Sequence, residues 1–284
     1  MLALLRKSWV EARWLLAGSA AVVFAFEWLR VWLVHQLPQD DFRLIMSVMP
    51  DAVKRMLPVP WEVIATPLGR IAWGYEEPLV LIVLSAWAIA RGSDSVSGEL
   101  GRGTMEMLLA QPVRRISVLS ANAAMTILGA ALIPAAAWLG TTVGLATNTF
   151  DVELSPLTFL PAVLNLFSLT LFLAGLTTLA SSCDQYRWRT IGVVGVAFVV
   201  SLVCKIVGRV AVGWKPLAYI SFFTPYEPGM LVVRRDLSWS LLAAPPAKEL
   251  LGALGSDGLL IAMAVVCYAG AAIIFCRRDL PAAV

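Results

Sequence analysis

The sequence predicts an all-α polytopic membrane protein. We expect six transmembrane helices, a short cytoplasmic coupling helix between helices 2 and 3, and interrupted outer segments before helices 2 and 6. Of the 284 residues, 59% are hydrophobic and only 14% are charged, and the mean hydropathy is +0.79. A soluble domain of this size would need far more polar surface. The hydrophobic runs are also continuous, whereas the strands of a transmembrane barrel alternate between apolar and polar residues.

The first segment combines an amphipathic start with a long apolar run. Residues 1–13 place Leu2, Leu5 and Trp9 on one helical face, which predicts an interfacial helix on the inner leaflet. The alternative is a charged lead-in to the first span. Residues 14–34 form that span, because about 20 apolar residues cross ~30 Å of hydrocarbon.

The other spans follow from the remaining apolar runs, and together they form a single transmembrane domain. Proline-rich outer loops with short helices are expected around them, and span three is longer than a bilayer needs, so it projects into the cytoplasm or bends at Pro134. The expected spans are 72–91, 117–147, 157–181, 191–212 and 258–276, and the outer loops are 35–71 and 213–257.

The distribution of basic residues predicts that both termini are cytoplasmic. The short stretches 1–13, 91–115 and 184–189 carry Lys and Arg, whereas the short loop 148–156 carries none. The two long loops also contain basic residues, but long loops translocate largely regardless of charge. The net charge of +3 is mild and gives no footprint for binding nucleic acid.

Two charged residues lie inside the first span. Glu27 and Arg30 are three residues apart, and a charge within lipid costs at least ~2.5 kcal/mol on insertion scales. Either they snorkel to the interface beside Trp28 and Trp32, or they line a polar pathway.

Three further polar or small-residue features lie in later spans. Lys205 and Arg209 near the outer end of span five leave the same two alternatives. Asn165 in span four is expected to hydrogen-bond between helices, or else to line a passage. Gly140 and Gly144 form a G-x-x-x-G motif, which lets two helix backbones approach closely and suggests a dimer contact.

The chain lacks the usual catalytic and nucleotide-binding motifs. No Gly-Lys dipeptide occurs, so there is no Walker A loop. His35 is the only histidine, which excludes an H-E-x-x-H zinc site and a Ser-His triad. The four cysteines form no C-x-x-C pair and are expected to be small apolar residues. We expect no catalytic residue, no metal and no cofactor in this chain.

Residues 99–115, between the second and third spans, form the most informative stretch. Gly101 and Gly103 permit a sharp entry turn, the Thr104 hydroxyl can cap a short helix, and Pro112 prevents its continuation. Such a polar segment does not belong inside lipid. It predicts a short helix at the cytoplasmic face.

That short helix has an apolar face for a soluble partner. Met105, Leu108 and Leu109 share one side by i, i+3, i+4 spacing, and we expect this face to fill a groove on the partner. Glu99 can pair with Arg102 across the entry turn, a contact worth only ~0.2–1 kcal/mol if exposed. The alternative is an interfacial helix that only orders the loop.

The segment resembles a family motif. Its pattern E-x3-G-T-x3-L-L-x2-P-x2-R, from Glu99 to Arg115, resembles the motif after the second membrane helix of ABC-2-type transporter permeases. Tyr226-Glu227-Pro228 is similar to a Tyr-Asp-Pro-like element of these permeases, and the run from Phe275 to Asp279 is similar to their closing F-x-R-R-D signature.

The resemblance implies a permease subunit of an ATP-driven transporter, an exporter, in the bacterial cytoplasmic (inner) membrane. ATP and Mg would bind to a separate ATPase subunit, and a second copy or a homologous permease would complete the membrane part, surrounded by lipid. Tyr226 and Glu227 join Glu27, Arg30, Gly140, Gly144 and Asn165 as pathway or interface candidates. The implied ATPase-coupling residues are Glu99, Arg102, Gly103, Thr104, Met105, Glu106, Leu108, Leu109, Pro112, Arg115, Asp184 and Arg187.

A second function stays open, that of a mechanical coupler. Such a protein would transmit ATPase motion to an extracytoplasmic partner without moving a solute, as in the branch of this family that serves copper-enzyme maturation. Met46, Met49 and Met56 lie in the first outer loop, and thioethers suit copper(I). Packing is the other interpretation of these methionines.

Overall fold

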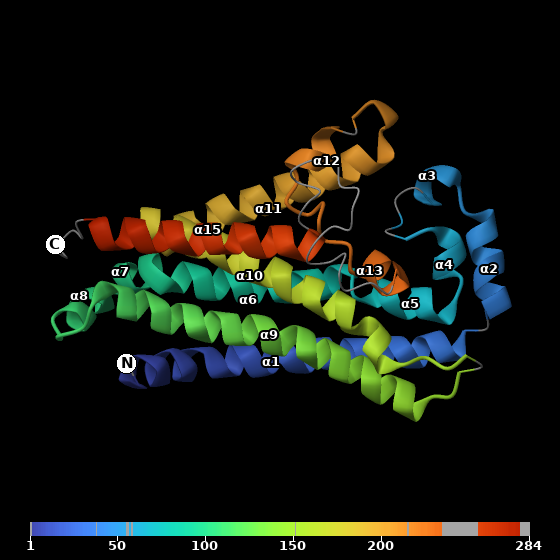
Figure 1. Ribbon diagram of the computed structural model, residues 1–284, viewed down its shortest axis with the longest axis horizontal. Helices are drawn as coiled ribbons and strands as arrows, with labels where there is room; N and C mark the ends of the chain where they lie inside the picture. The colour runs from blue at the N-terminus through green and yellow to red at the C-terminus, as the bar shows by residue number, and fades with distance from the viewer. Residues whose placement is uncertain are drawn as a thin grey trace.

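Six long helices form an elongated bundle (Figure 1). The computed structural model describes residues 2–37, 39–54, 57, 59–150, 152–214, 216–234 and 255–278. Within these residues, six segments are long and apolar enough to cross a membrane, so the predicted fold class is confirmed. They are α1 (Leu2–Gln36), α5 to α7 (Pro67–Gly101), α9 (Arg115–Thr147), η2 with α10 (Pro156–Cys183), α11 (Arg187–Val210) and α15 (Ser256–Arg277).

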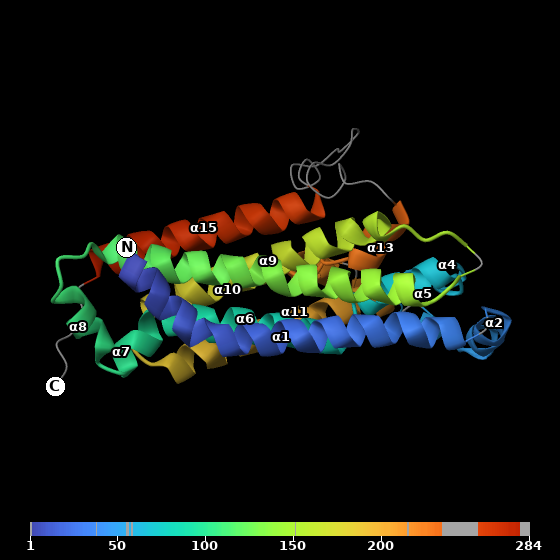
Figure 2. The same cartoon turned by 90° about the horizontal axis from the view of Figure 1, so that it is seen from below.

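The two ends of the bundle differ in what they carry. Figures 1 and 2 place the start of α1, the end of α15 and the short helix α8 (Thr104–Leu109) at one end. The helices α2 (Gln39–Val48) and α4 (Trp61–Ile64) lie at the other. Both ends of the described chain are therefore on the side that carries the 99–115 segment.

The core is built around α10, which packs against α15 and α6 (Pro78–Ser93), while α1 runs along α9. Large apolar side chains from these helices, such as Trp87, Ile133 and Leu166, are fully buried. By contrast, only four of the 24 residues of α11 are buried, and its Val193, Val196 and Val199 face outward. A lipid-facing helix is apolar on its outer side as well as its inner side.

Three elements differ from the sequence-based expectation. The helix α1 runs unbroken through residues 13 and 14, so the separate interfacial helix 1–13 is wrong; a continuous run of helix formers needs no break at the membrane boundary. The predicted span 72–91 is interrupted, because Pro78 begins α6 after α5 (Pro67–Gly74) has ended. The segment 99–115 is not one helix, as described below.

The two segments predicted to be outer loops both contain short helices. The first holds α2, α3 (Asp51–Lys54), α4 and α5. The second holds η3 (Val212–Trp214), α12 (Pro216–Ile220) and α13 (Pro228–Arg234). Residues 235–254 of the second outer loop, Asp279 of the closing signature, and Met56 lie outside the described residues.

Candidate functional site

A π-helix precedes the 99–115 segment. After α6 ends at Ser93, residues Asp94–Gly98 form the π-helix η1, and Glu99–Gly101 form the single turn α7. The hydroxyl of Ser181 on α10 accepts from the backbone N–H of Ser97 at 2.8 Å. The Ser97 hydroxyl also lies 3.1 Å from that of Thr190 on α11. These buried contacts fix the π-helix between two spans.

A left-handed turn follows. Gly103 has a φ of 69° and no atom within 4 Å of where a Cβ would lie, so glycine is required for its backbone conformation and not for space. The predicted cap is wrong: Gly103 is the N-cap residue of α8 (Thr104–Leu109), and no side chain caps it. The Thr104 hydroxyl instead donates to the Glu99 carboxylate. A hydrogen bond to a charged carboxylate is stronger than one between neutral groups. The Thr104 side chain therefore points toward Glu99, five residues earlier, and not toward the free backbone N–H groups of α8.

The apolar face of α8 turns inward. Met105 is 1% exposed and packs with Val96, Leu119 and Phe275. Leu109 lies at the edge of this cluster. The expectation that this face fills a partner's groove is therefore wrong for Met105, which the bundle itself covers, and stays a prediction for the half-buried Leu108 and Leu109.

Leu108 is half-buried. It packs against a second cluster formed by Leu4, Val118 and Ala121. By contrast, Met107 is 65% exposed, and Ala110, Gln111 and Pro112 are exposed beyond it. Met107 and residues 110–112 form an exposed surface, which we call the α8 tip.

Glu99 is the centre of one ion cluster behind the α8 tip. Its side chain is only 1% exposed and pairs with Lys7 of α1. The Arg102 guanidinium lies 3.2 Å from the same oxygen, so the predicted pair forms, but its carboxylate is buried rather than exposed. Lys7 also pairs with Glu11 at 3.4 Å. The contact between α1 and this segment was not predicted from the sequence.

Asp94, on the π-helix, is the centre of the second part of this cluster. It pairs with Arg102 at 2.6 Å, with Arg187 of α11 at 3.4 Å and with Arg91 at 3.8 Å. The hydrogen bond to Asp94 raises the pKa of Arg102, against the opposing effect of burial. Oxygens of Glu11, Asp94 and Glu99 lie within 4.8 Å of one another, and the surrounding Lys and Arg side chains neutralise them.

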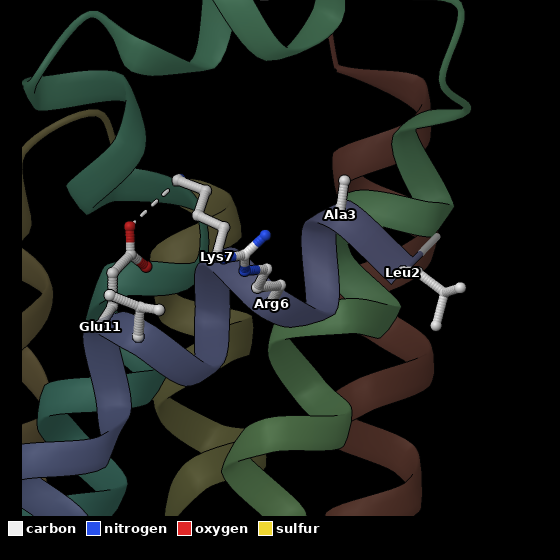
Figure 3. Close-up of a pocket in the computed structure, with 6 residues that line it drawn as sticks. Leu2, Ala3, Arg6, Lys7 and Glu11 are labelled. Carbon is white, nitrogen blue, oxygen red and sulfur yellow. Dashed lines mark ion pairs between the residues drawn. The ribbon is translucent and has the colours of Figure 1, made fainter.

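The start of α1 forms a groove beside this cluster (Figure 3). The groove has a volume of about 560 Å³ and is lined by Leu2, Ala3, Arg6, Lys7, Val10 and Glu11. Figure 3 shows Lys7 and Glu11 side by side on one face of the helix. The groove lies on the continuous first helix, so a partner bound there would contact a membrane span directly.

The second predicted contact loop is held from three sides. The Asp184 carboxylate accepts from the backbone N–H groups of Gln185 and Tyr186, at 2.6 and 3.0 Å. Arg278 donates to the Asp184 carbonyl at 3.2 Å. Arg115, at the start of α9, donates in turn to the Arg278 carbonyl at 2.6 Å. The closing signature therefore joins α9, α10 and α15 at the same end of the bundle.

The predicted pathway residues lie at the opposite end. Arg30 pairs with Glu77 at 3.1 Å. Glu27 is fully buried, and neither of its carboxylate oxygens has a hydrogen-bond partner among the described residues. A snorkelling position is therefore wrong for Glu27. Trp28 and Trp32 are exposed beside it, as expected for an interfacial position.

The G-x-x-x-G motif is used within the chain. A Cβ at Gly140 would overlap the carbonyl oxygen of Phe24, and one at Gly144 would lie 2.6 Å from the Cβ of Val31. Both glycines therefore face α1 of the same chain. The dimer contact suggested by the motif is already occupied by an intramolecular one.

Asn165 joins the outer segment to two helices. Its amide donates to Asp257 at 2.6 Å and to the Pro225 carbonyl at 3.0 Å. It also accepts from the Glu227 backbone N–H at 3.0 Å. The Tyr226 hydroxyl donates to the carbonyl of Tyr75 at 2.8 Å, and burial raises the pKa of Tyr226 well above its usual value. Hydrogen bonding between segments, rather than lining of a passage, accounts for Asn165.

Sequence reasoning missed several residues of the ion cluster behind the α8 tip, chiefly Lys7, Arg91 and Asp94. The charge pattern could have indicated them, because each is a charged residue at or just beyond the end of a predicted span. Asn122 was also missed; it accepts from Ser8 at 2.9 Å and from Arg91 at 3.1 Å.

Comparison with known families assigns the chain. The family model described as "ABC-2 family transporter protein" matches residues 8–280. No curated protein and no solved structure matches the chain. In this family the membrane subunit works with a separate ATPase that hydrolyses ATP, and typically as a dimer. The family model matches nearly the whole of this multi-pass helical bundle. The chain therefore belongs to the ABC-2 family and is the permease subunit of an ABC transporter.

Proposed function

We propose that this permease subunit is part of an exporter and that the α8 tip receives the motion of the ATPase. The single observation that carries the proposal is the 65% exposure of Met107 on α8, where Met105 is buried and Leu108 and Leu109 are half-buried. A protruding apolar side chain rimmed by polar residues is typical of a protein interface.

The ion cluster behind the tip supplies a route for that motion. Glu99 contacts α1 through Lys7, and Asp94 contacts α11 through Arg187. A push on α8 would therefore act on α1, α6 and α11 together. Such a displacement is the kind of rigid-body change that opens a membrane cavity on one side and closes it on the other.

The orientation follows from the same surface. If the ATPase binds the α8 tip, then both described ends of the chain face the cytoplasm, in the bacterial inner membrane. Two copies, or this chain and a homologue, would each present one tip to one ATPase subunit.

The test compares the effects of substitutions at Met107 and at its neighbour Leu108 on binding of the ATPase. Met107→Asp should abolish co-purification of the ATPase and ATP turnover stimulated by the permease, because an interface anchor costs at least ~2 kcal/mol, or about 30-fold in affinity. Val152→Asp is the matched control, since Val152 is an exposed apolar residue on the loop between α9 and α10. Leu108→Asp should instead lower the stability of the bundle. Intact co-purification with Met107→Asp would refute docking at the tip.

The mechanical coupler is the second candidate function, and one observation favours it. On α2, at the outer end, Leu44, Ile45 and Val48 are 71%, 55% and 81% exposed. An apolar face there could bind an extracytoplasmic protein. Replacing Leu44 and Val48 by Ser should leave solute export unchanged in an exporter, whereas a coupler would lose its downstream activity.

A further inference from the structure

A cavity of about 470 Å³ lies away from the cytoplasmic site, at the outer end of the bundle. One wall is the junction of α5 and α6, and the other is the last two turns of α11 together with the loop around Phe223. No step of the proposed coupling uses it.

The walls of this cavity are layered in polarity. Glu76 and Glu77 on one wall, and Lys205 and Arg209 on the other, form a charged rim. Leu81 lies one turn deeper than Glu77 along α6, and Leu202 and Phe223 supply the opposing apolar surface. The 24 residues of α11 span about 36 Å, so the charged rim in its last turns lies near the depth of the lipid headgroups.

Two of the four charges are already paired. Glu77 pairs with Arg30 at 3.1 Å, and Arg209 pairs with Glu227 at 3.3 Å.

The other two keep capacity for a ligand. Glu76 accepts from the Gly229 backbone N–H at 3.0 Å, and Lys205 donates to the Tyr226 carbonyl at 2.5 Å. Among the described residues, neither forms an ion pair within 4 Å, although the two charges attract each other and the Lys205 ammonium lies 5.3 Å from the centre of the Tyr226 ring. An ammonium group has three donors and a carboxylate about four acceptor positions, so each retains unused hydrogen-bonding capacity.

We propose that this cavity binds a zwitterionic amphiphile. A phosphate would contact Lys205, an ammonium group would contact Glu76, and an acyl chain would extend inward along Leu81, Leu202 and Phe223. Charges of both signs at headgroup depth above an apolar wall fit this ligand better than they fit an anionic lipid, which has no ammonium group to pair with Glu76. The ligand could be a phospholipid of the bilayer or a single-chain amphiphile that the transporter moves.

The experiment uses the delipidated full-length protein and native mass spectrometry. Lysophosphatidylethanolamine and lysophosphatidylglycerol are the probes. Wild-type protein should retain the ethanolamine lipid more tightly. Glu76→Gln should weaken it about tenfold and leave the glycerol lipid unchanged, and Lys205→Met should weaken both about tenfold, because a hydrogen bond to a charged group is lost. Glu153→Gln, an exposed carboxylate on a distant loop, is the matched control.

A further variant covers the case in which a charge substitution prevents folding. Leu202→Trp fills the apolar part of the cavity and should reduce retention of both lipids while leaving the charges in place. Equal retention of the two lipids by wild type, or unchanged retention in all three cavity variants, would overturn the proposal. These measurements need no ATPase, so a failure here is separate from a failure of docking at the α8 tip.

The source of the ligand is decided by adding the ATPase and ATP to protein loaded with lysophosphatidylethanolamine in nanodiscs. Unchanged occupancy during turnover identifies a resident bilayer lipid. A fall in occupancy that requires hydrolysis identifies a transported amphiphile. Either result supports the proposal that the cavity binds a zwitterionic amphiphile.

Discussion

The close approach of α1 and α9 can be tested by adding one methyl group. Gly140→Ala would place a Cβ onto the carbonyl oxygen of Phe24, and Gly144→Ala would place one 2.6 Å from the Cβ of Val31. Favourable carbon contacts lie at about 3.5–4.0 Å, so the two helices would have to separate by about 1 Å. The Phe24 carbonyl belongs to the backbone and cannot move by a rotamer change.

Overpacking of this kind costs about 1–3 kcal/mol. Gly192→Ala is the matched control, because a Cβ at Gly192, on the exposed helix α11, would meet no atom within 4 Å. The control carries the same gain of about 0.5–1 kcal/mol from removing a helical glycine. We therefore expect Gly140→Ala and Gly144→Ala to lower the midpoint of unfolding in SDS relative to Gly192→Ala.

The oligomeric state of each variant should be measured by light scattering in the same detergent. We expect it to stay unchanged, because the motif faces the chain's own first helix. Equal stability of Gly140→Ala and Gly192→Ala would refute the packing argument. Loss of a dimer with unaltered monomer stability would restore the intermolecular interpretation.

Three other outcomes follow from the six-span arrangement and from the contacts described above. Single cysteines at Asn148 and Arg102, in a cysteine-free background, should be labelled by a membrane-impermeant maleimide from opposite sides of the membrane; labelling from one side contradicts the six-span arrangement. Glu99→Gln should destabilise the bundle by about 1–3 kcal/mol, less than the loss of a fully buried pair because Lys7 is partly exposed. Thermal unfolding without denaturant, with Glu153→Gln as the control, would measure this loss. Asn165→Leu removes three hydrogen bonds and should expose the Pro225 loop to protease in intact cells, whereas unchanged cleavage would show that the loop is held elsewhere.

The number and class of the spans could be predicted because hydrophobic length alone determines them. The position of the 99–115 segment was also predictable, since a polar stretch with two glycines and a proline cannot lie in lipid. Continuity of α1 was not predictable in the same way. Its charged first turns looked like a separate interfacial helix, but the pairing of Lys7 with Glu99 holds them in line with the span.

The faces of α8 could not be predicted from periodicity. Spacing groups Met105, Leu108 and Leu109 on one side, but it does not say whether that side meets the bundle or a partner. Tertiary packing decided this, by placing Phe275 of α15 and Leu4 of α1 against it. The G-x-x-x-G motif has the same ambiguity, because close helix packing needs the same small residues within a chain as between chains.

The π-helix at Asp94–Gly98 has a consequence for register. A π-turn holds one residue more than an α-turn, and one residue corresponds to about 100° of rotation and 1.5 Å of rise. If this turn were rewound as α-helix, everything after Gly98 would rotate about the axis of α6 and advance along it. Arg102 and Glu99 would then leave the side of α1 and face another neighbour. The hydrogen bonds to Ser181 and Thr190 hold the extra residue in the π-helix. A force on the α8 tip that broke them would convert the π-turn into an α-turn and so rotate the end of the second span.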